Sequence, residues 1–151
     1  MKITDLLLED TMKIELQSTT KEGVIDELIE LLHSGERIDN PKKFRKAILA
    51  REKQSSTGVG DGVAIPHAKH KSVVKPALAF GISKEGVDYD SMDGKPSHIF
   101  FMIAAPEKGN DLHLEALSKL ARMLIHEDFR TGLLNAKTKE DVLALINNRE
   151  K

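Results

Sequence analysis

Two segments of this chain are almost entirely apolar and rich in β-forming residues, 78–83 (LAFGIS) and 98–104 (HIFFMIA). A half-exposed strand alternates apolar and polar residues, whereas a strand without polar interruptions is covered on both faces. These segments therefore predict central strands of a sheet with helices packed on both sides. This requirement places the chain in the α/β class.

The rest of the sequence alternates between helical and extended patterns. Helices are predicted over 3–8, from a Thr19–Glu22 capping box to Gly35, from Asn40-Pro41 to about Arg51, from Asn110 or Asp111 onward, near Phe129, and over 138–148. Further strands are predicted over 12–16, over 63–66 and near Tyr89, and residues 54–62 predict a loop. The pattern indicates one domain, residues 1–151, with a mixed parallel and antiparallel sheet in a three-layer sandwich.

Composition excludes several classes of function. Lys plus Arg number 23 and Asp plus Glu number 24, so the chain lacks the basic excess of a nucleic-acid or anionic-membrane binder. It contains no cysteine, which removes disulfides, thiolate nucleophiles and cysteine-based metal sites. No stretch reaches the roughly 20 apolar residues of a membrane span. We expect a cytoplasmic domain without membrane insertion and without a cofactor.

The densest group of reactive side chains lies in residues 51–70, REKQSSTGVGDGVAIPHAKH. Arg51 follows Phe44, Ala47 and Ile48 at helical spacings, so it shares their apolar face. An inward guanidinium needs an anionic partner. That partner is either a carboxylate of the chain, such as Glu52, or a bound anion.

His113 poses a similar alternative. Its spacing from Ala116, Leu117 and Leu120 puts it near the inward face of a helix, and it lies in the first turn. The helix dipole there favours a bound anion and disfavours the imidazolium. A single histidine in such a place is ordinarily a packing residue. An inward arginine in the same small domain makes an anion site the better interpretation.

Phosphoryl transfer fits these residue types. Neutral imidazole is a competent nucleophile near pH 7, and attack on a phosphoryl group otherwise needs positioning and donors for its oxygens. We expect His67 as the nucleophile and Arg51 as a bidentate donor. Thr57, His113 and the N–H groups of the Gly58–Gly60 loop are further candidate donors. The glycine spacing matches neither a Walker loop nor a dinucleotide fingerprint, so the donor is not predicted to be a bound nucleotide.

Metal binding by His67 and His70 is the competing interpretation. An extended chain sends side chains three residues apart to opposite faces of the strand. No cysteine or obvious carboxylate completes a ligand set. The sequence therefore predicts no metal site, and a plain metal- or ligand-binding domain remains the non-enzymatic alternative.

The run AREKQSSTGVGDGVAIPHAK resembles the fructose/mannitol-type enzyme IIA (EIIA type 2) of the bacterial phosphoenolpyruvate-dependent sugar phosphotransferase system. The later runs HIFFMIAAP and GNDLHLEALSKLARML match as well, so the resemblance covers essentially the whole chain. It implies that His67 is the phosphorylated residue, that His113 is its partner and that Arg51 faces the phosphate. Glu52 and Thr57 match the pattern too, as supporting residues. The α/β sandwich that the resemblance implies agrees with the pattern described above.

The resemblance also implies a reaction and its partners. His67 would accept a phosphoryl group from phospho-HPr and pass it to a cysteine of an enzyme IIB domain, which serves sugar uptake through the membrane enzyme IIC. The alternative is a regulatory, nitrogen-related enzyme IIA that signals by binding partner proteins. Transient docking predicts an apolar patch around His67, with Ala64, Ile65 and Ala68 nearest in sequence.

Overall fold

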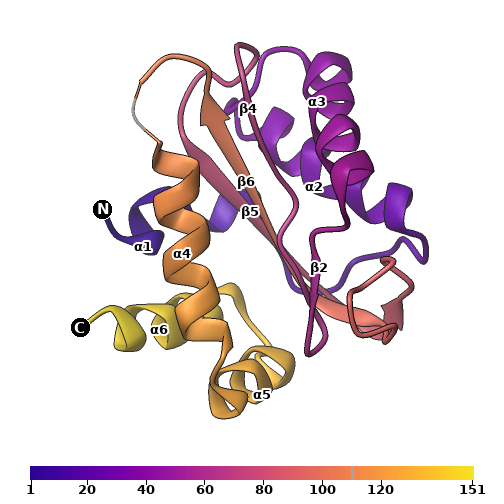
Figure 1. Cartoon of the computed structure of the whole chain (residues 1–151). Coiled ribbons are helices and arrows are strands. Elements are labelled where there is room, and N and C mark those ends of the chain that lie inside the picture. Colours follow the sequence, from indigo (N-terminus) through magenta and orange to yellow (C-terminus); the bar gives the residue numbers. More distant parts are fainter. Residues whose placement is uncertain (110) are drawn as a thin grey trace.

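The computed structural model describes residues 1–109 and 111–151. Its centre is an antiparallel pair of long strands, β5 (Ala77–Val87) and β6 (Ser97–Pro106), in which Phe80 lies opposite Phe101. Both strands are longer than the apolar segments that predicted them. The expectation of central strands covered on both faces is confirmed (Figure 1).

Shorter strands extend this pair into a mixed sheet of order β1-β5-β6-β3-β2, with β4 also paired to β6. On one side, β1 (Met12–Lys13) runs parallel to β5. On the other, β3 (Val63–Ala64) and β4 (His67–His70) run parallel to β6, and β2 (Gly58–Gly60) is antiparallel to β3. The predicted mixed sheet is therefore confirmed.

β3 and β4 are two parts of one interrupted strand. Val63 pairs with Ile99 and His67 pairs with Ile103, so both parts keep the same register against β6. Ile65 and Pro66 form the interruption, and Ile103 N–H still donates to Pro66 C=O (2.9 Å). Because proline has no N–H and fixes φ, it interrupts the ladder without shifting the register. His67 is the first residue after this interruption.

Helices cover the two faces of the sheet in separate sets, as Figure 1 shows. One face carries α2 (Lys21–Ser34) and α3 (Pro41–Gln54). The other carries α1 (Ile3–Leu6), α4 (Leu112–Leu124), α5 (Glu127–Asn135) and α6 (Lys139–Glu150). The result is the predicted three-layer sandwich.

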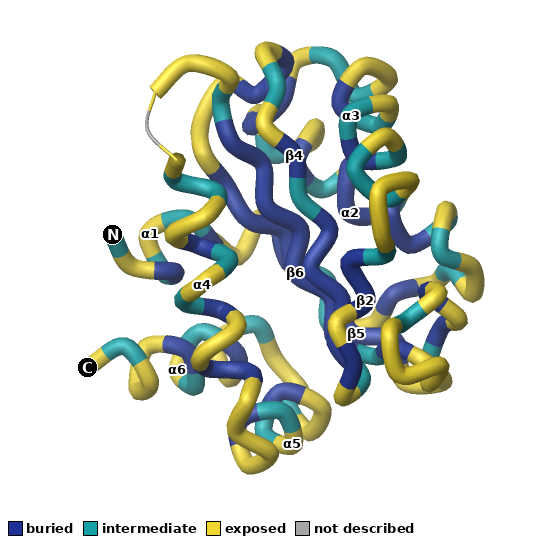
Figure 2. Tube along the Cα trace, in the orientation of Figure 1, coloured by how far each residue is buried: buried dark blue, intermediate teal, exposed yellow. Residues whose placement is uncertain are grey.

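The alternation of side chains along β6 divides the apolar core in two. Ile99, Phe101 and Ile103 pack under α4–α6, whereas Phe100 and Met102 pack under α2 and α3. All five are at most 2% exposed, and burying each such side chain stabilises the fold by about 1.5–3 kcal/mol. Figure 2 shows the buried sheet between helices whose outer faces are exposed.

Helix starts follow the expected capping chemistry with one shift. Thr20, not Thr19, caps α2, because its side chain accepts the Gly23 N–H (3.1 Å) and the helix begins at Lys21. Asn40 caps α3 as predicted. Of the two residues proposed to cap α4, Asn110 lies outside the described residues, and Asp111 occupies the N-cap position without a side-chain cap.

Two local predictions were wrong. The 54–62 loop contains β2, because Gly58 and Gly60 pair with β3. The expected strand near Tyr89 is irregular chain, because Asp90 adopts a positive φ of 54° directly after it.

In the described part of the chain, every helix is too short or too polar to cross a membrane.

Candidate functional site

A hollow of about 470 Å³ opens at the edge of the sheet between α3, β4 and α4. It brings together three residues that the sequence singled out, Arg51 from α3, His67 from β4 and His113 from α4. Its other lining residues are Ala47, Ala50, Gln54, Ala68, Lys69 and Leu114. The three predicted principal residues therefore share one site, although they come from three layers of the fold.

The position of His67 fixes the chemistry of its ring. Its Nδ1 lies 2.8 Å from the C=O of Ile65. A carbonyl only accepts hydrogen bonds, so Nδ1 carries the proton in the neutral ring and Nε2 carries a free lone pair. The side chain is half-buried and lines the hollow. His67 thus presents a nucleophilic nitrogen in a fixed orientation.

The surroundings keep this nucleophile unprotonated. Burial lowers the pKa of His67 below its ordinary value of 6.5, since the imidazolium loses hydration. The Ile65 carbonyl and the negative charge of Glu52 oppose this shift, while the positive charge of Arg51 lowers the pKa further. The neutral, nucleophilic form is therefore favoured near pH 7.

His113 lies in the first turn of α4, as the sequence predicted, with a half-buried ring. Its Nδ1 is buried and has no hydrogen-bond partner among residues 1–109 and 111–151. A proton on Nδ1 would bury an N–H without an acceptor, which is costly. The neutral ring therefore carries its proton on Nε2, as a donor toward an anion in the hollow.

Arg51 differs from the prediction in its burial. It is only partly buried at the end of α3, and its guanidinium donates to the C=O of Ser55 (2.9 Å). It forms no ion pair with any described carboxylate. The intramolecular ion pair with Glu52 is therefore wrong, because Glu52 pairs with Lys21 instead (3.0 Å). Arg51 keeps an uncompensated charge at the hollow.

Glu52 and Thr57 do not line the hollow. Glu52 accepts from the N–H of Thr57 (3.1 Å) and from its hydroxyl. Both donors of Thr57 are thus committed to this carboxylate. Their positions support a role in holding the 55–57 loop, and their predicted role in supporting the phosphate stays a prediction.

Gly58 and Gly60 also lie away from the hollow, and their lack of a side chain serves packing. Gly58 donates its N–H to Ser56 Oγ (3.0 Å), and a Cβ there would lie 3.0 Å from the Cα of Ser91. Gly60 has a φ of 104°, which favours glycine. The glycines allow the neighbouring 88–96 segment to approach closely, and their expected role in phosphate binding stays a prediction.

Sequence reasoning missed two groups of residues at this site. Lys21 and Tyr89 complete the environment of Glu52 from distant parts of the chain, and no local pattern places them there. Lys69 lines the hollow and lies 3.8 Å from Asp111, joining β4 to the start of α4. The sequence could have indicated this position, because Lys69 comes two residues after His67 and side chains two residues apart lie on the same side of a strand.

The expected apolar patch around His67 has a different composition. Ala64, Ile65 and Ala68 are 0%, 1% and 7% exposed and belong to the core. Strand pairing with β6 and the helices on both faces cover them. Leu114, one residue after His113, is 51% exposed and borders the hollow instead.

The ring of His70 is hydrogen-bonded to Ser72. Its Nδ1 accepts from the N–H of Ser72 (3.0 Å) and lies 2.8 Å from the Ser72 hydroxyl. In the part of the chain that is described, no three His, Asp or Glu side chains form a ligand group for a metal.

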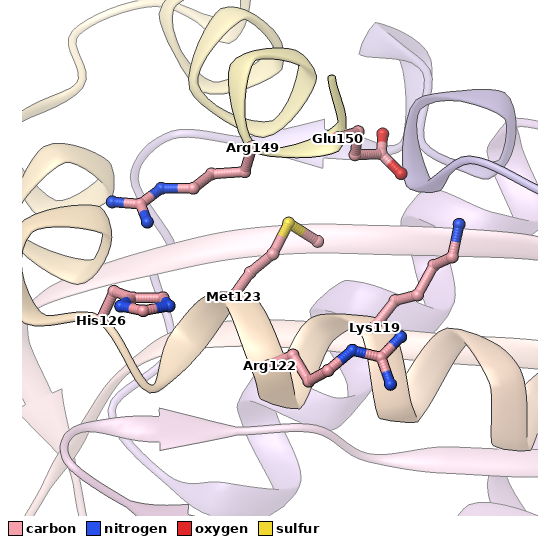
Figure 3. A pocket seen from close by; sticks show the side chains of 6 residues that line it. All are labelled: Lys119, Arg122, Met123, His126, Arg149 and Glu150. Carbon is pink, nitrogen blue, oxygen red and sulfur yellow. The ribbon is translucent and has the colours of Figure 1, made fainter.

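A second hollow, of about 390 Å³, lies near the other end of α4 and is lined by Lys119, Arg122, Met123, His126, Arg149 and Glu150 (Figure 3). Its cationic groups do not converge on one point, since Arg149 and His126 lie on one side of Met123, and Lys119 and Arg122 on the other. Arg149 pairs with Asp128 (2.5 Å). This hollow is therefore a weaker anion site than the one around His67.

The fold and the site together define a class, α/β domains that hold a neutral histidine between an arginine and a second histidine at a sheet edge. The family model described as "Phosphoenolpyruvate-dependent sugar phosphotransferase system, EIIA 2" matches residues 5–149. The chain belongs to this family.

Known relatives agree with this membership. The chain is 50% identical over 151 residues to the "PTS system fructose-specific EIIABC component" of Bacillus subtilis, of which it spans 24%. It is 45% identical over 140 residues to the "PTS system fructose-specific EIIA component" of Haloferax volcanii, covering 91% of both chains. The crystal structure of the nitrogen regulatory protein IIA-Ntr from Neisseria meningitidis superposes with a TM-score of 0.88 at 33% identity, covering 94% of this chain and 97% of that one.

Proposed function

We propose that this chain is a fructose-type phosphocarrier that accepts a phosphoryl group from phospho-HPr on Nε2 of His67. The observation that carries the proposal is the Nδ1–H···O=C bond to Ile65 (2.8 Å), which leaves Nε2 as the free nucleophile. In the transfer, the N–P bond of the donor histidine breaks and the Nε2–P bond forms, while the donor nitrogen keeps the electron pair. Arg51 and the Nε2–H of His113 donate to the phosphoryl oxygens.

The second transfer goes to a cysteine of an EIIB domain, which serves sugar uptake through EIIC. The Nε2–P bond breaks, an S–P bond forms on the thiolate, and His67 regains its lone pair. The chain has no cysteine, so this thiol comes from another domain or protein. The name of the Bacillus subtilis relative, EIIABC, joins A, B and C components and supports this sequence of partners.

The regulatory alternative rests on the likeness to the nitrogen regulatory protein, at 33% identity. The two fructose-specific relatives are more similar, at 50% and 45%. Both functions use the same phosphohistidine, and they differ in the acceptor. The higher sequence identity to the fructose-specific relatives favours the transport role.

The test is incubation with phosphoenolpyruvate, enzyme I and HPr, followed by intact-mass measurement. We expect one acid-labile phosphoryl adduct on the wild type and none on His67→Ala. Absence of an adduct on the folded wild type would refute the proposal. Addition of a fructose-type EIIB domain then separates the roles, because a transport component passes the group to the cysteine and a purely regulatory one retains it.

A further inference from the structure

A buried carboxylate, Glu52, directly follows the site residue Arg51 in the chain. The side chain of Glu52 is only 5% exposed, and it accepts from Lys21 Nζ (3.0 Å), Thr57 N–H (3.1 Å), Tyr89 O–H (3.2 Å) and the Thr57 hydroxyl. Lys21 also lies over the Tyr89 ring, 4.6 Å from its centroid. We call these four residues the Glu52 cluster. A buried carboxylate needs such full pairing to be tolerated.

The Glu52 cluster is connected to His67 through main-chain hydrogen bonds. Glu52 holds the N–H of Thr57, and the C=O of Thr57 accepts the N–H of Ile65 (3.0 Å). The C=O of Ile65 in turn accepts Nδ1–H of His67 (2.8 Å). The path from the carboxylate to the imidazole thus consists of three hydrogen bonds joined by the backbones of Thr57 and Ile65.

The residues along this path have little freedom to adjust. Ile65 precedes Pro66, and a residue before proline is restricted to extended conformations. Arg51 holds the same loop at a second point, through Ser55 C=O (2.9 Å). The orientation of the Ile65 carbonyl therefore depends on where the 55–57 loop is held.

We propose that Glu52 is a positioning residue for His67, acting through Thr57 and Ile65 to keep the imidazole proton on Nδ1 and the lone pair on Nε2. A fixed carbonyl acceptor selects one histidine tautomer and one ring orientation, as the outer partners of a metal-bound histidine do. The inference rests on the proposed phosphoryl transfer at His67. Glu52 itself does not touch the phosphoryl group.

If Glu52 had a purely structural role, the rate of phosphoryl transfer in each variant would fall only as far as its stability falls. Glu52→Met removes both acceptor oxygens and leaves the Thr57 N–H without its partner. Lys21→Met/Glu52→Met replaces the ion pair by apolar side chains, a change that is often neutral or stabilising. This double variant still lacks the acceptor for Thr57, so it separates positioning from stability.

The conservative variant and the control come from the same chain. Glu52→Gln keeps an amide oxygen for the Thr57 N–H, and its NH₂ group can donate to the two hydroxyls, which act as acceptors. The matched control is Glu27→Met, because Glu27 is a similar clamp. It binds Lys13 Nζ (2.9 Å) and the N–H groups of Gln17 (2.9 Å) and Ser18 (2.5 Å), none of which lines the hollow.

The experiment measures three quantities for each variant: the urea midpoint of unfolding, the rate of phosphorylation by phospho-HPr, and the ¹⁵N shifts of the His67 ring. We expect the double variant to recover part of the stability that Glu52→Met loses, because no unpaired lysine remains, while its rate stays about tenfold below the wild type and its shifts move from one tautomer to a mixture. Glu52→Met shows the same loss of rate, and Glu52→Gln stays within about threefold of the wild type. Glu27→Met loses stability and keeps the rate.

The inference is overturned if the folded double variant keeps the wild-type rate and a single His67 tautomer, or if Glu27→Met slows transfer equally. The ring shifts need no phosphoryl donor. A wild type that takes no phosphoryl group therefore refutes the proposed function, while the effect of the Glu52 cluster on the tautomer is still measured directly.

Discussion

His113 offers the most specific test of how the site treats a phosphoryl group. Its buried Nδ1 lacks a partner among the described residues, so the ring is inferred to act as a neutral Nε2–H donor. The amide nitrogen of Gln lies about where imidazole Nε2 lies, whereas that of Asn lies near Nδ1. His113→Gln therefore keeps the donor, and His113→Asn moves it into the buried position.

The size of the effect follows from one charge-assisted hydrogen bond. Such a bond is worth about 1.5–3 kcal/mol, and about 1.4 kcal/mol corresponds to a tenfold change in rate. We expect phosphorylation of His113→Ala and His113→Asn to slow by roughly 10- to 100-fold, and that of His113→Gln by less than about fivefold.

The assay is rapid-quench measurement of phosphohistidine formation at saturating phospho-HPr, with urea unfolding to establish that each variant is folded. A His113→Gln protein as slow as His113→Ala would refute the reasoning. That result would mean that the site requires the imidazolium charge or proton exchange by the ring. Wild-type rates in all three variants would instead leave His113 as a packing residue.

The other predictions concern charge and packing. The ring of His67 should titrate with a midpoint below pH 6.5 in an NMR titration. The rate of phosphorylation should therefore fall as the pH drops through that midpoint. A midpoint at or above 6.5 would contradict the argument that burial lowers this pKa. Arg51→Gln removes a charge that lowers this pKa, so the midpoint should rise while transfer slows about tenfold at pH 7.5. In β5, Gly81→Ala would place a Cβ 2.6–2.8 Å from three carbons of Leu16, costing about 1–3 kcal/mol in urea unfolding. Because Leu16→Ala removes those carbons, the double variant should lose less stability than the sum of the single changes, and strict additivity would contradict the clash.

The architecture was largely predictable because its signals are local. The uninterrupted apolar runs of β5 and β6 predicted central strands, and Asn40-Pro41 marked the start of α3. Errors arose where tertiary contacts decided the outcome. The predicted loop over 54–62 contains β2, because Gly58 and Gly60 pair with Ala64 and Val63 of β3.

The sequence predicted which residues form the site, but it did not predict the hydrogen bonds and ion pairs around them. Motif and helical spacing gave His67, His113 and Arg51, which the structure brings to one hollow. Nothing in the sequence pairs Lys21 with Glu52 or directs Tyr89 toward them, because these contacts span 31 and 37 positions. The chain's single tyrosine, fully buried, was the signal that could have prompted a search for a polar partner.

The three principal residues belong to three different layers, since Arg51 lies on one helical face, His67 on the sheet and His113 on the other helical face. The two apolar cores that hold these helices are separate. Sliding of either helical layer along the sheet would therefore spread the three residues apart while each core stayed packed. The rate of phosphoryl transfer should therefore depend on the alignment of the three layers. In mild denaturant, this rate should decline before the helical signal in circular dichroism changes.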